Sequence, residues 1–138
     1  MSLLNPVDSL IYSMTLSAAI DGTISEKELN SINFFVNTLP VFKNFDTDSL
    51  PKKMNECMQL IEAEESFENI LDAINSNLEK ELKRTAFILS IEIMMTEMNI
   101  DEGAVRFLDI FGNILELSEL EKAASKFLIR AKYSEANK

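Results

Sequence analysis

The chain has no histidine, no tryptophan and only two tyrosines among its 138 residues. Without histidine, a Ser-His or Cys-His catalytic pair cannot form, and a zinc site would lack one of its usual ligands. A glycosidase is also poorly supported, because few aromatic side chains are present on which a sugar could stack. An enzyme is therefore the weakest interpretation, and we expect a protein that is not an enzyme.

Cysteine and long apolar runs are scarce as well. Cys57 is the single cysteine, so a disulfide framework is excluded and a reducing compartment is compatible with the sequence. The start, residues 1–4, lacks the basic and long apolar parts of a signal peptide. No run of about 18 apolar residues occurs that would span a bilayer. We expect a cytoplasmic protein.

Three glycines and three prolines leave few positions for hairpin turns, whereas Glu, Leu, Lys and Ala are abundant. With 46% hydrophobic and 26% charged residues, the composition is that of an ordinary globular protein. We therefore predict a single all-α domain over residues 1–138. The net charge of −10 would repel nucleic acid, so a cation or a basic protein surface is the better partner.

Apolar residues spaced three and four positions apart predict a bundle of about seven helices. The expected ranges are approximately 6–20, 26–38, 48–62, 65–78, 79–98, 102–115 and 119–132. In the last helix we expect Leu120, Ala124, Phe127 and Leu128 to face inward, and we expect the chain from Tyr133 onward to fray.

The predicted fifth helix is apolar almost all round between residues 86 and 95, which is typical of the centre of a bundle. Glu92 interrupts this stretch. A carboxylate there must be paired, protonated or directed toward water. Because unpaired charges are rarely buried, we expect Glu92 to lie at a surface seam or to pair with a Lys or Arg from another helix.

An acidic turn, residues 21–28, lies between the first two predicted helices. Ser25 and Glu28 have the spacing of a capping box, which predicts a helix start at Glu26. The same turn resembles the second half of an EF-hand calcium loop, but Ala19 and Ser17 occupy the two upstream ligand positions. An independent EF-hand is therefore not expected, and a helix cap without an ion remains an alternative.

A second turn matches this one at a constant offset of 76 residues. The aligned pairs are Asp21 with Glu97, Ile24 with Ile100, Ser25 with Asp101, Leu29 with Val105, and Ile32 with Leu108. In the second copy, Met98 replaces Gly22 and Ala104 replaces Glu28. The match predicts a degenerate duplication of a helix-turn-helix unit. If the two halves pack with pseudo-twofold symmetry, Asp21 and Glu97 would converge near one end of the bundle.

The chain contains an apolar helix ending in Ala-x-Asp-Gly-x-Ile-Ser-x-x-Glu and, about 70 residues later, a second apolar helix, a turn and Phe-x-x-Ile-Leu-x-Leu-Ser. These features, between residues 18–28 and 88–118, resemble the tellurite-resistance TerB family and its wider superfamily. The resemblance implies an all-α domain of about seven helices in a bacterial cytoplasmic protein. It also implies a link to tellurite and other chemical stress, with clustered acids proposed to hold a divalent cation, often calcium.

On that resemblance, the metal ligands would be Asp21 and Glu28 directly and Glu97 by conservative replacement, whereas Ala104 stands where a further acid is expected. One interpretation is a TerB-like accessory domain of the bacterial stress response that binds a divalent cation, calcium before others. The alternative is a metal-free helical adaptor that docks a basic protein partner, or a partner within a membrane complex. Membrane association would then be indirect.

Overall fold

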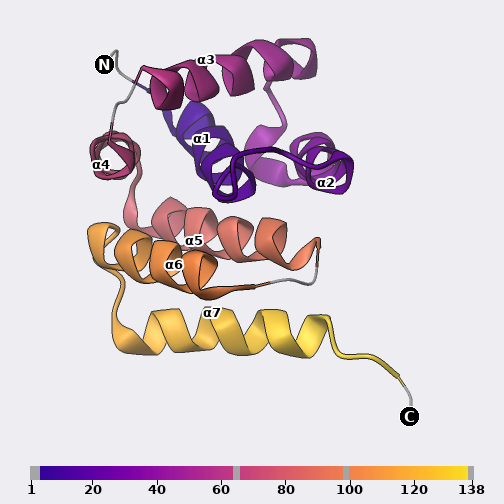
Figure 1. Ribbon diagram of the computed structural model, residues 1–138, viewed down its shortest axis with the longest axis vertical. Coiled ribbons are helices and arrows are strands. Elements are labelled where there is room, and N and C mark those ends of the chain that lie inside the picture. Colours follow the sequence, from indigo (N-terminus) through magenta and orange to yellow (C-terminus); the bar gives the residue numbers. More distant parts are fainter. Residues whose placement is uncertain (1–3, 64–65, 98–99, 137–138) are drawn as a thin grey trace.

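The computed structural model describes residues 4–63, 66–97 and 100–136, and within these it contains seven α-helices and no strand (Figure 1). The helices are α1 (Pro6–Ala18), α2 (Glu26–Thr38), α3 (Leu50–Glu62), α4 (Phe67–Ser76), α5 (Lys80–Met95), α6 (Glu102–Ile114) and α7 (Glu119–Lys132). Two short 3-10 helices, η1 (Pro40–Phe42) and η2 (Thr47–Ser49), connect α2 to α3. The predicted all-α helical bundle is confirmed.

The helices begin where capping residues precede them. The side chain of Asn5 accepts the backbone N–H of Asp8 at 2.7 Å, and Pro6 occupies the first position of α1. Ser25 and Ser118 each form a capping box at the start of α2 and α7. The helix ends were predicted less well, because α1 stops at Ala18 and α5 at Met95. Met98, to which the fifth helix was predicted to extend, lies outside the described residues.

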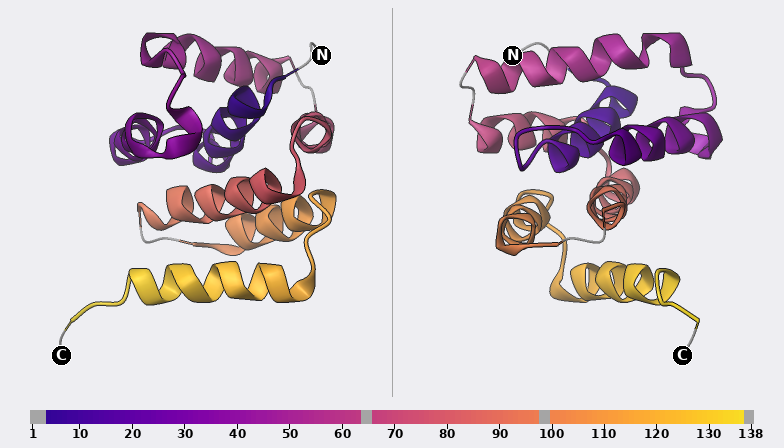
Figure 2. Two further views of the ribbon diagram at one scale, coloured as in Figure 1. Left: turned by 180° about the vertical axis from the view of Figure 1, so that it is seen from behind. Right: turned by 45° about the vertical axis from the view of Figure 1, so that its right-hand side comes forward.

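The helices stack in layers, from α3 at the top of Figure 1, through α1 and α2, then α5 and α6, to α7 at the bottom. The two further views in Figure 2 show the same order, with α7 at the outer edge. At the centre, α1 packs against α3, α4 and α5, and α5 packs in turn against α6 and α7. The prediction that the fifth helix is central is therefore confirmed, although α1 shares that place.

Helix α1 is enclosed on all sides, since residues 8–18 are all buried. Four of these residues carry aliphatic hydroxyl groups, namely Ser9, Ser13, Thr15 and Ser17. Each hydroxyl donates a hydrogen bond to the carbonyl oxygen four residues earlier in the chain, at 2.7 to 3.0 Å. Because these bonds satisfy the four hydroxyls within the chain of α1 and its N-cap, these side chains can be buried without polar partners on neighbouring helices.

The predicted offset of 76 residues is present in the structure. The bounds of α2 and α6 differ by that number at both ends, and so do their N-caps, Ser25 and Asp101. The exposure of aligned side chains agrees as well, since Leu29 is 41% exposed and Val105 is 46% exposed. Met98, the residue aligned with Gly22, lies outside the described residues. The two halves of the chain therefore share a helix-turn-helix register.

The predicted inner face of the last helix is wrong. In α7, Leu120 is 78% exposed, Phe127 67% and Leu128 54%. Ala124 is exposed with them. The residues that α7 buries are instead Lys122, Ser125 and Ile129.

Packing and ion pairs together explain this orientation of α7. A Cβ atom at Gly112 would lie 2.7 Å from Cδ of Lys122, so the bare backbone of α6 leaves room for the lysine chain. The ammonium group of Lys122 donates to Asn113 at 2.9 Å. Ion pairs from α7 to α5 then hold the polar face inward, and the apolar stripe is left outside.

A candidate cation site between two turns

The turn between α1 and α2 depends on Gly22, whose φ of 102° is rarely adopted by residues with a side chain. Its N–H donates to the carbonyl oxygen of Ala19 at 2.9 Å. The carboxylate of Asp21 accepts the N–H of Thr23 at 3.4 Å, while the rest of the side chain is exposed. This geometry leaves Asp21 at the surface, in the turn that connects α1 to α2.

Glu28 closes the capping box of α2. Its carboxylate accepts the N–H of Ser25 at 2.9 Å, and its own N–H donates to the hydroxyl of Ser25 at 3.1 Å. Glu28 is only 8% exposed. Burial raises the pKa of its carboxyl group, the bonds from Ser25 lower the pKa, and the charges of Asp21 and Glu97 raise it further. The charges of both other predicted ligands therefore act on the carboxyl group of Glu28.

The turn between α5 and α6 provides the second set of acids. Glu97 follows the end of α5 and is exposed. Asp101 is the N-cap of α6, and its carboxylate accepts the N–H of Ala104 at 2.9 Å. Asp101 was predicted only as a helix cap, so its place beside the other acids was missed. Asp101 stands three residues before Ala104, which is the spacing of an N-cap. This spacing was the signal in the sequence that could have indicated its place near the other acids.

The two turns line one cavity of about 60 Å³ that is partly open to solvent. All three sequence-predicted ligands, Asp21, Glu28 and Glu97, line it together with Asp101. The remaining lining residues are Ser17, Ala18, Ile20, Met94 and Ala104. The fold thus gathers four carboxylates from segments that are far apart in the sequence. The volume is enough for an ion with a few water molecules.

Among the residues that the structure describes, no three His, Cys, Asp or Glu side chains form a ready set of metal ligands. Ala104 also lines the cavity, and it offers no side-chain oxygen. Asp21 and Glu97 are exposed, so a change of rotamer costs them little. Ligation by these acids therefore requires their side chains to turn inward.

The other conspicuous acid, Glu92, is part of an internal ion pair instead. Lys132 donates to its carboxylate at 2.6 Å, and the hydroxyl of Tyr133 donates to its other oxygen. The prediction that Glu92 pairs with a Lys or Arg from another helix is confirmed. The chain from Tyr133 onward was predicted to fray. This is wrong for Tyr133 itself, which is partly buried and bonded to Glu92, although α7 does end at Lys132. Residues 137 and 138 lie outside the described residues. Burial first, and then Glu92, raise the pKa of Tyr133 to about 12.

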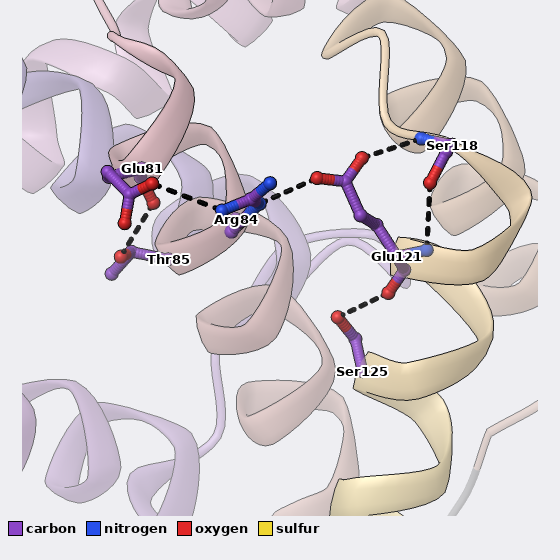
Figure 3. A network of polar contacts seen from close by, with 6 residues as sticks. All are labelled: Glu81, Arg84, Thr85, Ser118, Glu121 and Ser125. Atoms are coloured by element: carbon purple, nitrogen blue, oxygen red, sulfur yellow. Dashed lines mark hydrogen bonds and ion pairs between the residues drawn. The ribbon is translucent and has the colours of Figure 1, made fainter.

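Figure 3 shows a second polar network, which connects α5 to the start of α7. Arg84 donates to Glu121 at 2.6 Å and to Glu81 at 3.1 Å. The N–H of Ser118 also donates to Glu121, at 2.8 Å. The bond from Ser118 and the contact with Arg84 lower the pKa of Glu121 to about 2. Both carboxylates, Glu92 and Glu121, are thus occupied by structural contacts.

Cys57 is buried in α3, and its burial raises the pKa of the thiol to about 12. The thiolate that a nucleophile or soft-metal ligand requires is therefore scarce at neutral pH.

In the described ranges, none of the helices has the length and apolar character to cross a membrane. The chain matches no protein-family model, no curated protein and no solved structure at a significant level.

Proposed function

We propose that the protein is a TerB-like, non-catalytic accessory domain that binds a divalent cation, calcium before others, in the cavity between the α1–α2 and α5–α6 turns. The observation that carries this proposal is the meeting of Asp21, Glu28, Glu97 and Asp101 around that cavity. Carboxylate oxygens are the ligands that calcium prefers in proteins. A role in the bacterial response to tellurite or related stress rests on the family resemblance.

The electrostatics of the cavity favour a cation. Glu28 is buried and lies within the fields of Asp21 and Glu97, so its charged form is unfavourable when nothing compensates it. A bound divalent ion would offset this repulsion. The exposed acids would complete the coordination together with water, which predicts weak binding compared with a closed EF-hand.

Binding would also have a structural consequence. Asp21 and Glu28 belong to the first helix-turn-helix unit, and Glu97 and Asp101 belong to the second. An ion held by both pairs would tie the two halves together and stabilise the folded state. The domain would then respond to cation concentration through its rigidity, without catalysis.

The test is a calcium titration followed by amide NMR shifts on the wild type and on the double variant Asp21→Asn, Glu28→Gln. Glutamine can still close a capping box, so the start of α2 is kept. The matched control is Glu121→Gln, which makes the same change in the capping box of α7. We expect saturable shifts around both turns in the wild type and the control, and none in the double variant.

If the wild type shows no shifts with millimolar calcium, magnesium or manganese, the cation proposal is wrong. The acidic turn is then a helix cap alone. The alternative, a metal-free adaptor that docks a basic protein partner, would take its place.

A further inference from the structure

Helix α7 presents an apolar stripe to solvent along its whole length. The stripe consists of Leu120, Ala123, Ala124, Phe127, Leu128 and Ala131, all exposed. Their spacing of three and four residues places them on one face of the helix. Such a continuous apolar face is unusual on a protein surface that has no partner.

The two ends of the stripe carry opposite charges. Glu119 and Glu121 lie in the first turn of α7, and Glu116 lies in the turn between α6 and α7. Arg130 and Lys132 lie in the last turn. Of the five, Glu121 and Lys132 are held within the chain by Arg84 and Glu92, respectively. Glu116 and Glu119 also form ion pairs within the chain, with Lys83 and Lys122, but their side chains stay 76% and 94% exposed at the acidic end. The exposed Arg130 lies at the basic end.

We propose that the α7 stripe binds the α7 stripe of a second copy of this chain, with the two helices antiparallel about a two-fold axis near Ala124. The acidic end of each stripe then lies beside the basic end of the other, so Glu116 and Glu119 face Arg130 of the second copy. A parallel arrangement would instead bring like charges together.

The same register also fits the sizes of the side chains. Ala123 and Ala124 occupy the centre, where the two helices cross, and small residues allow close approach there. Leu120 then lies opposite Phe127 and Leu128 of the second copy, on either side of the crossing. Size and charge thus agree on one arrangement, and an interface of this two-fold kind closes on itself as a dimer.

A lipid surface is a poorer occupant. The chain carries a net charge of −10, which an anionic membrane would repel. An amphipathic helix that lies on such a membrane carries Lys and Arg along its polar face. The stripe of α7 is flanked by acids at one end, which a second copy matches and an anionic bilayer does not.

The first test is the molar mass measured by light scattering after gel filtration, over a range of protein concentrations. We expect a species of twice 15.6 kDa for the wild type. Phe127→Glu should weaken association at least about thirtyfold, because it places a charge among the large apolar side chains of the interface. Phe34→Glu is the matched control, since Phe34 is also exposed, on α2. A wild type that stays monomeric at all concentrations, or variants that behave alike, would overturn the proposal.

A charge exchange tests the antiparallel orientation. Arg130→Glu should weaken association about tenfold, and adding Glu119→Arg in the same chain should restore most of the loss. If the double variant is as weak as or weaker than the single one, the orientation is wrong.

Crosslinking tests the position of the axis. Ala124→Cys should form a disulfide-linked dimer on oxidation, because each Ala124 faces its counterpart, while the native Cys57 is buried. The control Asn55→Cys, at an exposed position of α3, should stay monomeric. The result would be contradicted by equal crosslinking of both. It would also be contradicted if wild-type monomer sediments with phosphatidylglycerol vesicles and Phe127→Glu does not, since α7 would then face lipid.

Discussion

At the residue scale, three glutamates have different roles in the structure. Glu28 closes a helix cap and lines the acidic cavity. Glu92 is buried against Lys132 and Tyr133, and Glu121 connects the start of α7 to Arg84. Glu92 and Glu121 each contact a positively charged side chain, whereas the charged neighbours of Glu28 are the carboxylates of Asp21 and Glu97. The charge of Glu28 is therefore the one that a bound ion would compensate.

The pH dependence of stability should reveal the contacts of Glu121. Its pKa is lowered from 4.5 to about 2 in the folded state, so its carboxylate stabilises the fold above its unfolded pKa. That contribution is lost as the pH falls through about 2. We expect Glu121→Gln to reduce the free energy of unfolding at pH 7 and to have little effect near pH 2, measured by urea unfolding. A difference that is constant with pH would contradict the assignment.

Removing the partner of Glu92 should destabilise the bundle. Glu92 accepts hydrogen bonds from Lys132 and Tyr133, and Lys132→Met removes the first of these. Because the side chain of Lys132 is itself half exposed, we expect a loss of about 1–2 kcal/mol rather than that of a fully buried pair. Lys43→Met, at an exposed position after η1, is the control in the same urea unfolding experiment. Equal effects would show that the ion pair contributes little.

At the scale of elements, the turn between α6 and α7 is strained. Glu116 has a φ of 62°, a conformation that favours glycine. The bonds from the N–H of Glu116 to Asn113 and from Leu117 to Gly112 end α6 in a Schellman motif. The chain therefore carries a glutamate where helices commonly have glycine, and this cost should be measurable.

We expect Glu116→Gly to raise the free energy of unfolding by about 0.5–1 kcal/mol, because it relieves the positive φ. Glu116→Ala is the matched control, since it also removes the 3.4 Å contact with Lys83 and keeps the strain. Chemical unfolding of both variants separates the two effects. If alanine stabilises as much as glycine, the backbone at this turn is not strained.

The reverse substitution, from glycine to a residue with a side chain, can be tested at Gly22 in the turn between α1 and α2. Its φ is 102°, and nothing lies within 4 Å of a Cβ atom built there. Gly22→Ala should therefore cost about 1–2 kcal/mol through the backbone alone. Gly103→Ala is a useful control in thermal unfolding, because Gly103 lies inside α6 and a Cβ there would meet Asp101 at an ordinary 3.4 Å. A smaller loss for Gly22→Ala than for the control would contradict this account of the turn.

What the sequence predicted and what it did not can be separated at this scale. The caps Ser25 and Asp101 fix the register of α2 and α6. Their offset was therefore enough to predict that Asp21 and Glu97 lie near each other, and both line one cavity. The orientation of α7 was not predictable, because its apolar stripe resembles an inner face. Only the three-dimensional contacts of Lys122 show that the other face is the buried one. A lysine that packs through its carbon chain has no distinct signal in a sequence.

At the scale of the whole molecule, the two turns come together because α1 and α5 pack against each other at the centre of the bundle. The buried serine and threonine hydroxyls of α1 bond to their own helix, and the hydroxyl of Ser90 on α5 donates to the carbonyl oxygen of Ser13 at 3.5 Å. The acidic cavity lies at the turns that precede α2 and α6, the second helices of the two helix-turn-helix units. An ion bound there would act on the packing of the entire bundle.

The thermal unfolding temperature with and without calcium, at matched ionic strength, tests the central claim most directly. At a calcium concentration ten times the dissociation constant, a site that exists only in the folded state adds about 1.4 kcal/mol of stability. The melting temperature should then rise by roughly 5 °C. The rise should vanish in the variant Asp21→Asn, Glu97→Gln and persist in Glu121→Gln. An unchanged melting temperature in the wild type up to millimolar calcium, magnesium and manganese would contradict the claim that the two turns form a cation site.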